Sequence, residues 1–452
     1  MDEDTIVALA TPPGRAGIAL IRLSGNQSQE IIRSVFEPLP LRWQGRKSYH
    51  GFIHQQGRRI DECLVTIFKA PRTYSGEDMA EISLHSNHAL IEAVIDLTCR
   101  FGARPALPGE FTFRAFRNGK LDLLQAEAVN ELIQANSRVF AQMEFGNLEG
   151  RLSKRIDSIR SRLLQMAVAI ETDIEFAEDQ NLETADAVFG LSAAAADLEK
   201  VLSQSRFNEI LDNGVHVVIA GMVNVGKSSL FNALLMKERS IISHLPGTTR
   251  DYIQEKLHLD GLPFQITDMA GIRPGTGDDI ENQGMSRSLD KIAQADAVIF
   301  VVDASRPVLD GDREIYRLLG NKKRILLANK KDLAPDGALA TIRRDFPGET
   351  VHLLSARNGE NLEPLIDFLR NLWRQTEALA GELAVNLRQK TLLEKLLHNL
   401  RQIERMQSLC PLPAEVIAEE IRLGLRLIGE LTGAISSAEV LQGIFAKFCI
   451  GK

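Results

Sequence analysis

Residues 215–235 read VHVVIAGMVNVGKSSLFNALL, and this stretch decides the fold of the central part of the chain. The apolar run Val215 to Ala220 predicts a short buried strand. After it, Gly221 and Gly226-Lys227-Ser228 follow the spacing G-x-x-x-x-G-K-S, and a helix-like segment begins. A strand, a glycine-rich turn and a helix in this order are typical of a phosphate-binding loop.

The residue types in this loop suit the binding of a polyphosphate. Gly221 and Gly226 allow the backbone to curl so that successive N–H groups point inward, and the following helix adds the positive end of its dipole. Lys227 would reach the β- and γ-phosphates, and the Ser228 hydroxyl would bind Mg²⁺ on the same oxygens. The nucleotide contacts predicted for the loop are Asn224, Val225, Gly226, Lys227, Ser228 and Ser229.

A later element predicts which nucleotide is bound. The stretch 329–332, NKKD, follows the apolar strand Ile325 to Ala328 and fits N-K-x-D, in which Asp332 accepts hydrogen bonds from the N1–H and the amino group of guanine. Adenine presents the opposite edge, so the element selects GTP. The stretch 355–357, SAR, follows the strand Val351 to Leu354 and resembles the loop whose backbone N–H contacts guanine O6. The predicted base contacts are Asn329, Lys330, Asp332, Ser355, Ala356 and Arg357.

Two stretches between these motifs are predicted to be GTPase switches. The alternating strand Leu262 to Thr267 runs into DMAG, which fits D-x-x-G: Asp268 would hold Mg²⁺ through water, and the Gly271 N–H would sense the γ-phosphate. Residues 246–251, PGTTRD, supply the other switch, with Thr249 as the second Mg²⁺ hydroxyl. The predicted nucleotide contacts in the switches are Ser243, His244, Leu245, Pro246, Gly247, Thr248, Thr249, Asp268, Met269, Ala270 and Gly271.

Two residues of this pattern need an explanation. Ile272 follows Gly271, at the position where Ras-like GTPases carry a glutamine that orients the attacking water, and an aliphatic side chain cannot do this. Asn224 lies inside the phosphate-binding loop, where its amide oxygen could hold a monovalent cation against the β- and γ-phosphates. The alternative is that Asn224 only caps or braces the loop, and the spacing leaves both interpretations open.

Nine motifs along the chain carry a resemblance to a known family. They are TIVALATPPGRAGIALIRLSG, YSGED, PGEFTFRAF, LDLLQAEAV, GMVNVGKSSLFNALL, PGTTRD, DMAGIR, NKKD and IFAKFCIGK. With them the whole chain resembles the MnmE (TrmE) family of bacterial tRNA-modification GTPases. Two positions depart from the family pattern: Val223 replaces a proline of the phosphate-binding loop, and Met269 replaces the threonine of D-T-A-G. Without the proline ring the loop loses a fixed φ, which bears on its rigidity.

The resemblance implies that hydrolysis depends on potassium. In the family, K⁺ is held by the loop asparagine and by the first switch, and it drives face-to-face dimerisation of two GTPase domains. The K⁺ ligands implied here are Asn224, Ser243, Leu245 and Thr248. A glutamate of the second switch replaces the missing glutamine, and Glu281 aligns best with that catalytic role, beside Lys227 on the phosphates. Asp278 or Asp279 could be the true match instead.

The resemblance also implies a folate site. The family binds a one-carbon folate, 5-formyl-tetrahydrofolate or methylene-tetrahydrofolate, in an N-terminal domain shared across a homodimer. The residues at the folate positions are Arg22, Glu81, Lys120 and Lys452. A cation would meet the folate glutamate carboxylates and Glu81 the amino edge of the pterin; without the resemblance, each is more simply a solvated surface charge. The resemblance further implies that the C-x-G-K motif brings Cys449 towards this pocket, where it could be catalytic. The alternative is that a cysteine at this position is incidental.

Length and composition narrow the class of protein. A chain of 452 residues that is 44% hydrophobic predicts two to four domains with ordinary cores. The formal net charge of −7 argues against a basic coat for nucleic acid, although a local patch stays open. The four cysteines have no metal-ligand spacing. The acidic start MDEDTIVALA and the lack of a long apolar run favour a cytoplasmic protein with no membrane or DNA partner.

Periodicity predicts a multidomain α/β protein in which a GTPase is inserted into a helical domain. Residues 1–118 alternate strands and helices and form a mixed α+β domain, to which the resemblance assigns folate binding and dimerisation. The strands predicted in it are Thr5 to Ala10, Ile18 to Leu23, Cys63 to Phe68 and Ala80 to His85. Residues 211–375 predict a Ras-like, doubly wound and mostly parallel sheet. Residues 119–210 and 376–452 are helical and would join into one bundle, the second part ending in FCIGK.

Apolar residues recur at helical spacing from Leu152 to Ile170, and again from Leu393 to Ile403 and from Ile417 to Leu431. Arginines flank the first of these stripes at positions 151, 155 and 162. They could meet tRNA phosphates, but a charge row on an amphipathic helix is more often its solvated face.

The expected function is therefore that of a potassium-activated GTP hydrolase that acts on tRNA. The resemblance adds a flavoprotein partner, MnmG, in a heterotetramer that installs an aminomethyl or carboxymethylaminomethyl group at C5 of the wobble uridine, U34. One rival is a regulatory switch of the Era or Der kind in ribosome assembly, which would be expected to carry a basic RNA-binding domain after the GTPase. Another is a stand-alone folate-dependent methyltransferase with a regulatory GTPase.

Overall fold

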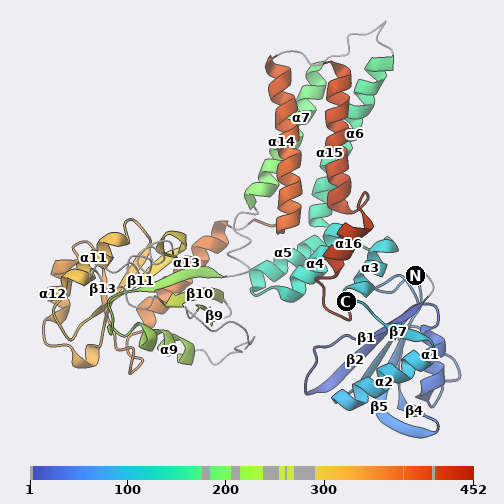
Figure 1. Ribbon diagram of the computed structural model, residues 1–452, viewed down its shortest axis with the longest axis horizontal. Coiled ribbons are helices and arrows are strands. Elements are labelled where there is room, and N and C mark those ends of the chain that lie inside the picture. The colour runs from blue at the N-terminus through green and yellow to red at the C-terminus, as the bar shows by residue number, and fades with distance from the viewer. Residues whose placement is uncertain are drawn as a thin grey trace, which may run out of the picture. The chain divides into compact units, whose positions relative to one another are not determined.

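The computed structural model describes residues 4–175, 184–204, 214–237, 254–259, 262–268, 291–379, 381–409 and 413–452. Contacts divide the chain into two compact units (Figure 1). The first unit comprises Met1–Ile133, Glu144–Leu202 and Asn386–Lys452, and the second comprises Gln134–Met143 and Ser203–Val385. The chain leaves the first unit and returns to it, as expected when one domain is inserted into another.

Within the described residues, the first unit contains a seven-stranded sheet. Its strands are β1 (Thr5–Leu9), β2 (Ala16–Ser24), β3 (Phe36–Glu37), β4 (Ser48–Gln55), β5 (Arg58–Phe68), β6 (Met79–Ser86) and β7 (Ala103–Pro105), in the order β3-β4-β5-β6-β2-β1-β7. Neighbouring strands are antiparallel except β1 and β7. The four strands predicted from sequence are confirmed. Strand β4 was not predicted, because Gly51 interrupts its alternation of apolar and polar residues.

Helices cover this sheet on both faces. Helices α1 (Ser28–Val35) and α2 (His88–Arg100) pack on one face, where Ile32 and Val94 join the buried strand residues. Helix α3 (Glu110–Arg117) contributes Phe111 to a smaller cluster with Ile6 and Met79. The first part of the chain is therefore the mixed α+β fold that its pattern predicts.

The rest of the first unit is helical. Its helices are α4 (Leu123–Gln134), α5 (Arg138–Leu148), α6 (Arg151–Glu175), α7 (Thr184–Gln204), α14 (Leu387–Leu409), α15 (Ala414–Thr432) and α16 (Ala438–Phe445). The last residue of α4 and the first half of α5 are assigned to the second unit, which includes Gln134–Met143. Helix α15 packs against both α6 and α14, so helices from before and after the second unit form one bundle (Figure 1). The apolar repeats predicted for these helices are confirmed as their buried rows. None of the helices that the structure describes is long and apolar enough to cross a membrane.

The second unit is built on a six-stranded sheet within the part of the chain that is described. Its strands are β8 (Val215–Ala220), β9 (Gln254–Leu259), β10 (Leu262–Asp268), β11 (Ala297–Asp303), β12 (Arg324–Asn329) and β13 (Val351–Leu353), in the order β13-β12-β11-β8-β10-β9. Only the pair β9 and β10 is antiparallel among these neighbours. The mostly parallel, doubly wound sheet predicted from sequence is confirmed, and β9 adds an antiparallel edge strand to it.

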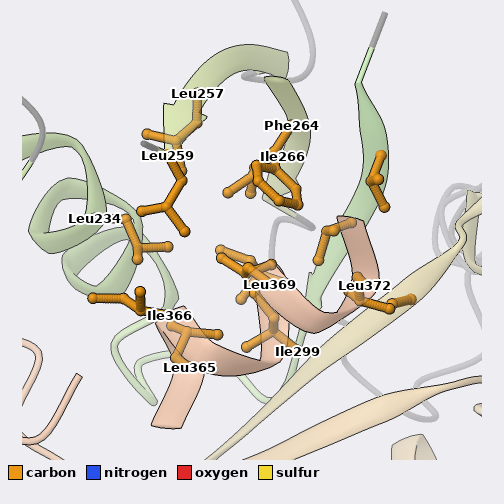
Figure 2. Packing of buried hydrophobic residues seen from close by; sticks show 14 of the residues in the cluster. Leu234, Leu257, Leu259, Phe264, Ile266, Ile299, Leu365, Ile366, Leu369 and Leu372 are labelled. Carbon is orange, nitrogen blue, oxygen red and sulfur yellow. The ribbon is translucent and has the colours of Figure 1, made fainter. Parts of the chain in front are cut away.

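The helices of this unit are α9 (Lys227–Lys237), α11 (Asp310–Leu318), the short 3-10 helix η2 (Lys331–Leu333), α12 (Ala338–Asp345) and α13 (Glu363–Leu379). Helices α9 and α13 pack on one face of the sheet, and Figure 2 shows Leu369 of α13 beside Ile299 of β11 and Leu234 of α9 near Ile366 of α13. Helices α11 and α12 cover the other face. Both faces of the strands are buried, which explains their nearly continuous Val, Ile and Leu content.

Candidate functional site

The first candidate site lies at the carboxyl ends of the parallel strands of the second unit, where ligands bind in open α/β sheets. Strand β8 ends at Ala220, and the predicted phosphate-binding loop follows and leads into α9. In this loop Asn224 has a positive φ of 64° and its side chain is exposed. At Gly226, where φ is +96°, a Cβ would collide with the side-chain nitrogen of Asn329, so only glycine fits.

Lys227 is the first residue of α9, and its side chain folds back over the loop. Its Nζ donates hydrogen bonds to the carbonyl oxygens of Gly221 (3.0 Å) and Met222 (2.9 Å), and the residue is only 7% exposed. Ser228 is exposed in the first turn of the same helix. The ammonium group and the N-terminal end of α9 therefore face the same loop, an arrangement suited to anion binding.

Asn329 joins the loop after β8 to the loop after β13. Its Nδ2 donates to the Val225 carbonyl and its Oδ1 accepts from the Ala356 N–H, both at 2.9 Å. The residue is 2% exposed, so both of its partners are protected from water. The predicted phosphate loop and the predicted base loop are thus held together by one side chain.

Asp332 and Ser355 form the polar part of the base loop. The Ser355 Oγ donates to Asp332 Oδ1 at 2.6 Å, and this hydrogen bond lowers the pKa of Asp332 below its usual value. Lys330 has a positive φ of 67° and its Nζ binds the carboxylate of Asp303 at 2.6 Å. An ionised carboxylate held at the end of β12 can accept two hydrogen bonds from one planar ligand edge.

A cavity of about 490 Å³ adjoins this loop, a volume within the range of small-molecule sites. It is lined by Ser229, Asn232, Ala233, Ala356, Arg357, Asn358, Gly359 and Leu362. Ser229, Ala356 and Arg357 are predicted nucleotide contacts that the structure brings together here. Sequence reasoning missed Asn232 and Ala233, which lie one helical turn beyond Ser229 on α9 and could have been found from that spacing.

Many predicted switch residues lie outside the described residues. These are Ser243, His244, Leu245, Pro246, Gly247, Thr248, Thr249, Met269, Ala270, Gly271 and Glu281, together with the alternatives Asp278 and Asp279. Asp268 ends β10, beside β8, but its side chain is outside the described part of the chain. Their roles in binding Mg²⁺, K⁺ and water stay predictions.

A second candidate site lies in the first unit. Arg22 of β2 and Glu81 of β6 are opposite each other across the two strands, and they form a salt bridge of 2.8 Å. The Arg22 guanidinium carbon lies 5.7 Å from the centre of the Tyr74 ring and 5.9 Å from that of Phe111. These two rings were missed by sequence reasoning, although Tyr74 stands in YSGED and Phe111 in PGEFTFRAF. Tyr74 is half-buried and can contact a flat ligand beside the salt bridge, whereas Phe111 is fully buried and packs beneath the guanidinium.

The C-terminal segment reaches the same place. The Arg22 Nη1 donates to the Gly451 carbonyl oxygen at 3.3 Å. Burial, and next the charge of Arg22, lower the pKa of Lys452, whereas Glu81 and Cys449 act in the opposite direction. Of the predicted folate residues, Arg22, Glu81 and Lys452 are therefore brought together, with Cys449 close by.

Lys120, the fourth predicted folate residue, bonds to a different part of the first unit. Its side chain is exposed and its Nζ donates to the carbonyl oxygen of Pro71 at 3.1 Å. The arginines of α6 are also partly engaged: Arg162 binds Asp197 at 2.8 Å and Arg151 lies 3.6 Å from Glu149. Two of the three arginines proposed as tRNA phosphate contacts on α6 are therefore paired with carboxylates.

Comparison with known proteins identifies the family of the chain. A family model described as the MnmE helical domain matches residues 123–449, and one described as the GTP-binding protein TrmE N-terminus matches residues 5–120. The tRNA modification GTPase MnmE of Thermotoga maritima is 37% identical over 99% of this chain and 100% of that protein. The protein of the same name from Aquifex aeolicus is 37% identical over 100% of both. A crystal structure of Aquifex aeolicus Era is 30% identical, covers 34% of this chain and 56% of that chain, and has a TM-score of 0.30. From the extent of the first four matches, the chain belongs to the MnmE (TrmE) family of tRNA modification GTPases.

Proposed function

We propose that this protein is a potassium-activated GTPase that modifies the wobble uridine of certain tRNAs with a folate-derived carbon. Membership of the family makes the chain a GTP hydrolase. The observation that carries the folate part is the meeting of Arg22, Glu81 and Lys452 in the first unit, because GTP hydrolysis by the second unit does not require these residues.

The GTP site uses the loops of the second unit. The Asp332 carboxylate would accept hydrogen bonds from the guanine N1–H and amino group, since Ser355 keeps it ionised and oriented. Lys227 and the N-terminal end of α9 would hold the phosphates. Ser228 and Thr249 would bind Mg²⁺, which, when bound, neutralises charge on the phosphate oxygens. Glu281 would position the attacking water.

Potassium activation is proposed from Asn224. Its positive φ places it at an exposed turn of the phosphate loop, and an asparagine tolerates that conformation. The side-chain oxygen is a ligand type suited to a monovalent cation. Its proposed partners in the K⁺ site are Ser243, Leu245 and Thr248.

The folate site is proposed at the Arg22–Glu81 salt bridge. The residues present fit 5-formyl- or methylene-tetrahydrofolate, because the Glu81 carboxylate can accept hydrogen bonds from the pterin amino edge, with the Arg22 guanidinium and the Tyr74 ring beside it. Lys452 supplies a second cation, and exposed Lys120 could reach the outer part of the ligand. Cys449 is the proposed nucleophile or proton donor near the reacting carbon.

The proposed partners are those that the family resemblance implies. Two copies would share the folate site as a homodimer, the flavoprotein MnmG would join them in a heterotetramer, and tRNA would be the substrate. All of these would meet in the cytoplasm. GTP hydrolysis would drive a conformational cycle and transfer no phosphate to tRNA.

The first experiment compares GTP turnover in potassium chloride and sodium chloride at equal ionic strength. Potassium should accelerate hydrolysis several-fold in the wild type, and Asn224→Ala should abolish this gain because it removes a proposed cation ligand. Asn321→Ala, an exposed asparagine of the same unit, is the matched control and should keep the gain. Equal, slow rates in both salts and a silent Asn224→Ala would reject potassium activation and favour a regulatory switch.

The folate part has its own test. Isothermal titration with 5-formyl-tetrahydrofolate should show binding to the wild type and much weaker binding to Arg22→Ala, since the guanidinium is the central cation of the site. Absence of binding to the wild type would reject the folate proposal whatever the GTPase result.

A further inference from the structure

The C-terminal segment 446–452 is seated against the start of helix α3 by backbone hydrogen bonds. The Gly109 N–H donates to the Cys449 carbonyl oxygen at 3.4 Å, and the Phe111 N–H donates to the Lys452 carbonyl oxygen at 3.2 Å. Gly109 is the residue that immediately precedes α3. The two bonds hold the residues at both ends of the C-I-G-K motif.

Aromatic packing brings the segment to this place. The ring centres of Phe445 and Phe113 are 5.3 Å apart, and those of Phe445 and Phe448 are 5.1 Å apart. Both Phe445 and Phe448 are buried with Leu123 in one cluster. This packing fixes the end of α16. The last four residues are held by the backbone bonds to α3, by the contact with Arg22 and by the close approach of Gly451 to Leu9 and Ala10.

Gly109 allows the close approach. Its φ is +67°, and a Cβ built on it would lie 2.6 Å from the Phe445 carbonyl oxygen and 2.9 Å from the Phe448 Cβ. Real Cβ atoms essentially never come within 3.0 Å of such atoms, so any side chain here would push the segment away. The obstructing atoms belong to backbone and to a Cβ, which cannot rotate aside.

We infer that Gly109 is a positioning residue of the proposed folate site: its bare backbone seats the C-terminal segment so that Lys452 lies beside Arg22 and Glu81, with Cys449 next to Lys452. Gly109 acts through the segment and touches no ligand itself. The inference rests on the proposed folate site, and it adds to that site a residue from outside the pocket.

The test compares Gly109→Ala with Gly57→Ala. Gly57 also has a positive φ, +79°, in the turn between β4 and β5, but none of the described atoms lies within 4 Å of a Cβ placed there, so it reproduces the backbone strain without the collision. Hydrogen–deuterium exchange of the peptide covering residues 446–452 should speed up in Gly109→Ala only. Affinity for 5-formyl-tetrahydrofolate should fall about tenfold in Gly109→Ala, as when one hydrogen bond to a charged group is lost, and stay unchanged in Gly57→Ala. GTP turnover should be the same in both.

Two further variants separate positioning from general destabilisation. Gly109→Asn tolerates a positive φ but keeps the Cβ, so it should lose folate affinity as Gly109→Ala does, and it serves if the alanine variant does not fold. In a double-mutant cycle, Gly109→Ala with Lys452→Ala should bind folate no more weakly than Lys452→Ala alone, because both changes remove the same contact.

Three results would overturn the inference: exchange of residues 446–452 equal in Gly109→Ala and Gly57→Ala, equal folate affinities in these variants, or additive effects in the cycle. Failure of the wild type to bind folate would instead reject the proposed function. The exchange experiment needs no ligand, so it still decides whether Gly109 seats the segment.

Discussion

Asn329 offers the sharpest test of how the nucleotide site is held together, because one side chain joins two loops. It bonds to the Val225 carbonyl and to the Ala356 N–H, both at 2.9 Å, and is 2% exposed. In Asn329→Ala both backbone groups lose their partner at a buried position. A buried polar group without a partner costs about 1–3 kcal/mol, so the paired arrangement of the two loops should lose about 2–6 kcal/mol.

This loss should appear in nucleotide affinity, because the phosphates and the base are bound by those two loops together. A cost of about 2 kcal/mol corresponds to roughly 30-fold, so the Kd for GDP should rise by at least that factor. Titration with a fluorescent GDP analogue measures it, and calorimetry of the nucleotide-free chain should show a lower Tm for the second unit. Asn321→Ala, at an exposed asparagine of the same unit, should change neither quantity.

Asn329→Asp separates the donor from the acceptor. It keeps an oxygen for the Ala356 N–H but turns a negative charge towards the Val225 carbonyl, so it should bind GDP no better than Asn329→Ala. If Asn329→Ala binds GDP within about threefold of the wild type and melts at the same temperature, the reasoning is refuted, and the loops must be held by their backbones alone.

Other predictions concern stability. Arg388→Met leaves Glu127, whose side chain is 7% exposed, without its cation and should destabilise the first unit by about 3–5 kcal/mol in urea unfolding. Arg401→Met removes an exposed guanidinium that pairs with Glu199 and Glu404 and should cost about 1 kcal/mol or less. Burial lowers the pKa of His216 below 6.5 in the folded chain. As the pH falls, His216 is therefore protonated at a higher pH in the unfolded chain than in the folded chain. The Tm of the second unit should therefore fall as the pH drops from about 7.5 through 6.5 to about 5.5, and His216→Gln should flatten part of this slope; a slope that does not change would contradict it. Leu369→Ala empties a fully buried position between α13 and the sheet (Figure 2) and should cost about 2–5 kcal/mol in the same unfolding experiment, a value that a cost under about 1 kcal/mol would contradict.

Features that depend on short stretches of chain could be predicted from the sequence. Strand β8 begins at Val215 and ends at Ala220, as its apolar run predicts, and the helix predicted after the G-K-S of the loop is α9, which already begins at Lys227. The buried rows of α6, α14 and α15 follow the predicted repeats. Burial within one strand or helix has a fixed period, and a tight loop imposes its glycines, so a window of about 20 residues carries this information.

Contacts between residues far apart in the sequence became known from the folded structure. Arg22 contacts Gly451 across 429 positions, and Asn329 contacts Val225 across 104. The packing of the Tyr74 and Phe111 rings near Arg22, and the need for a bare backbone at Gly109, cannot be read from any local pattern, because many segments are apolar enough to pack against one another. Strand register and the fit of complementary surfaces choose among those pairings, and neither is expressed in the residues of one segment alone.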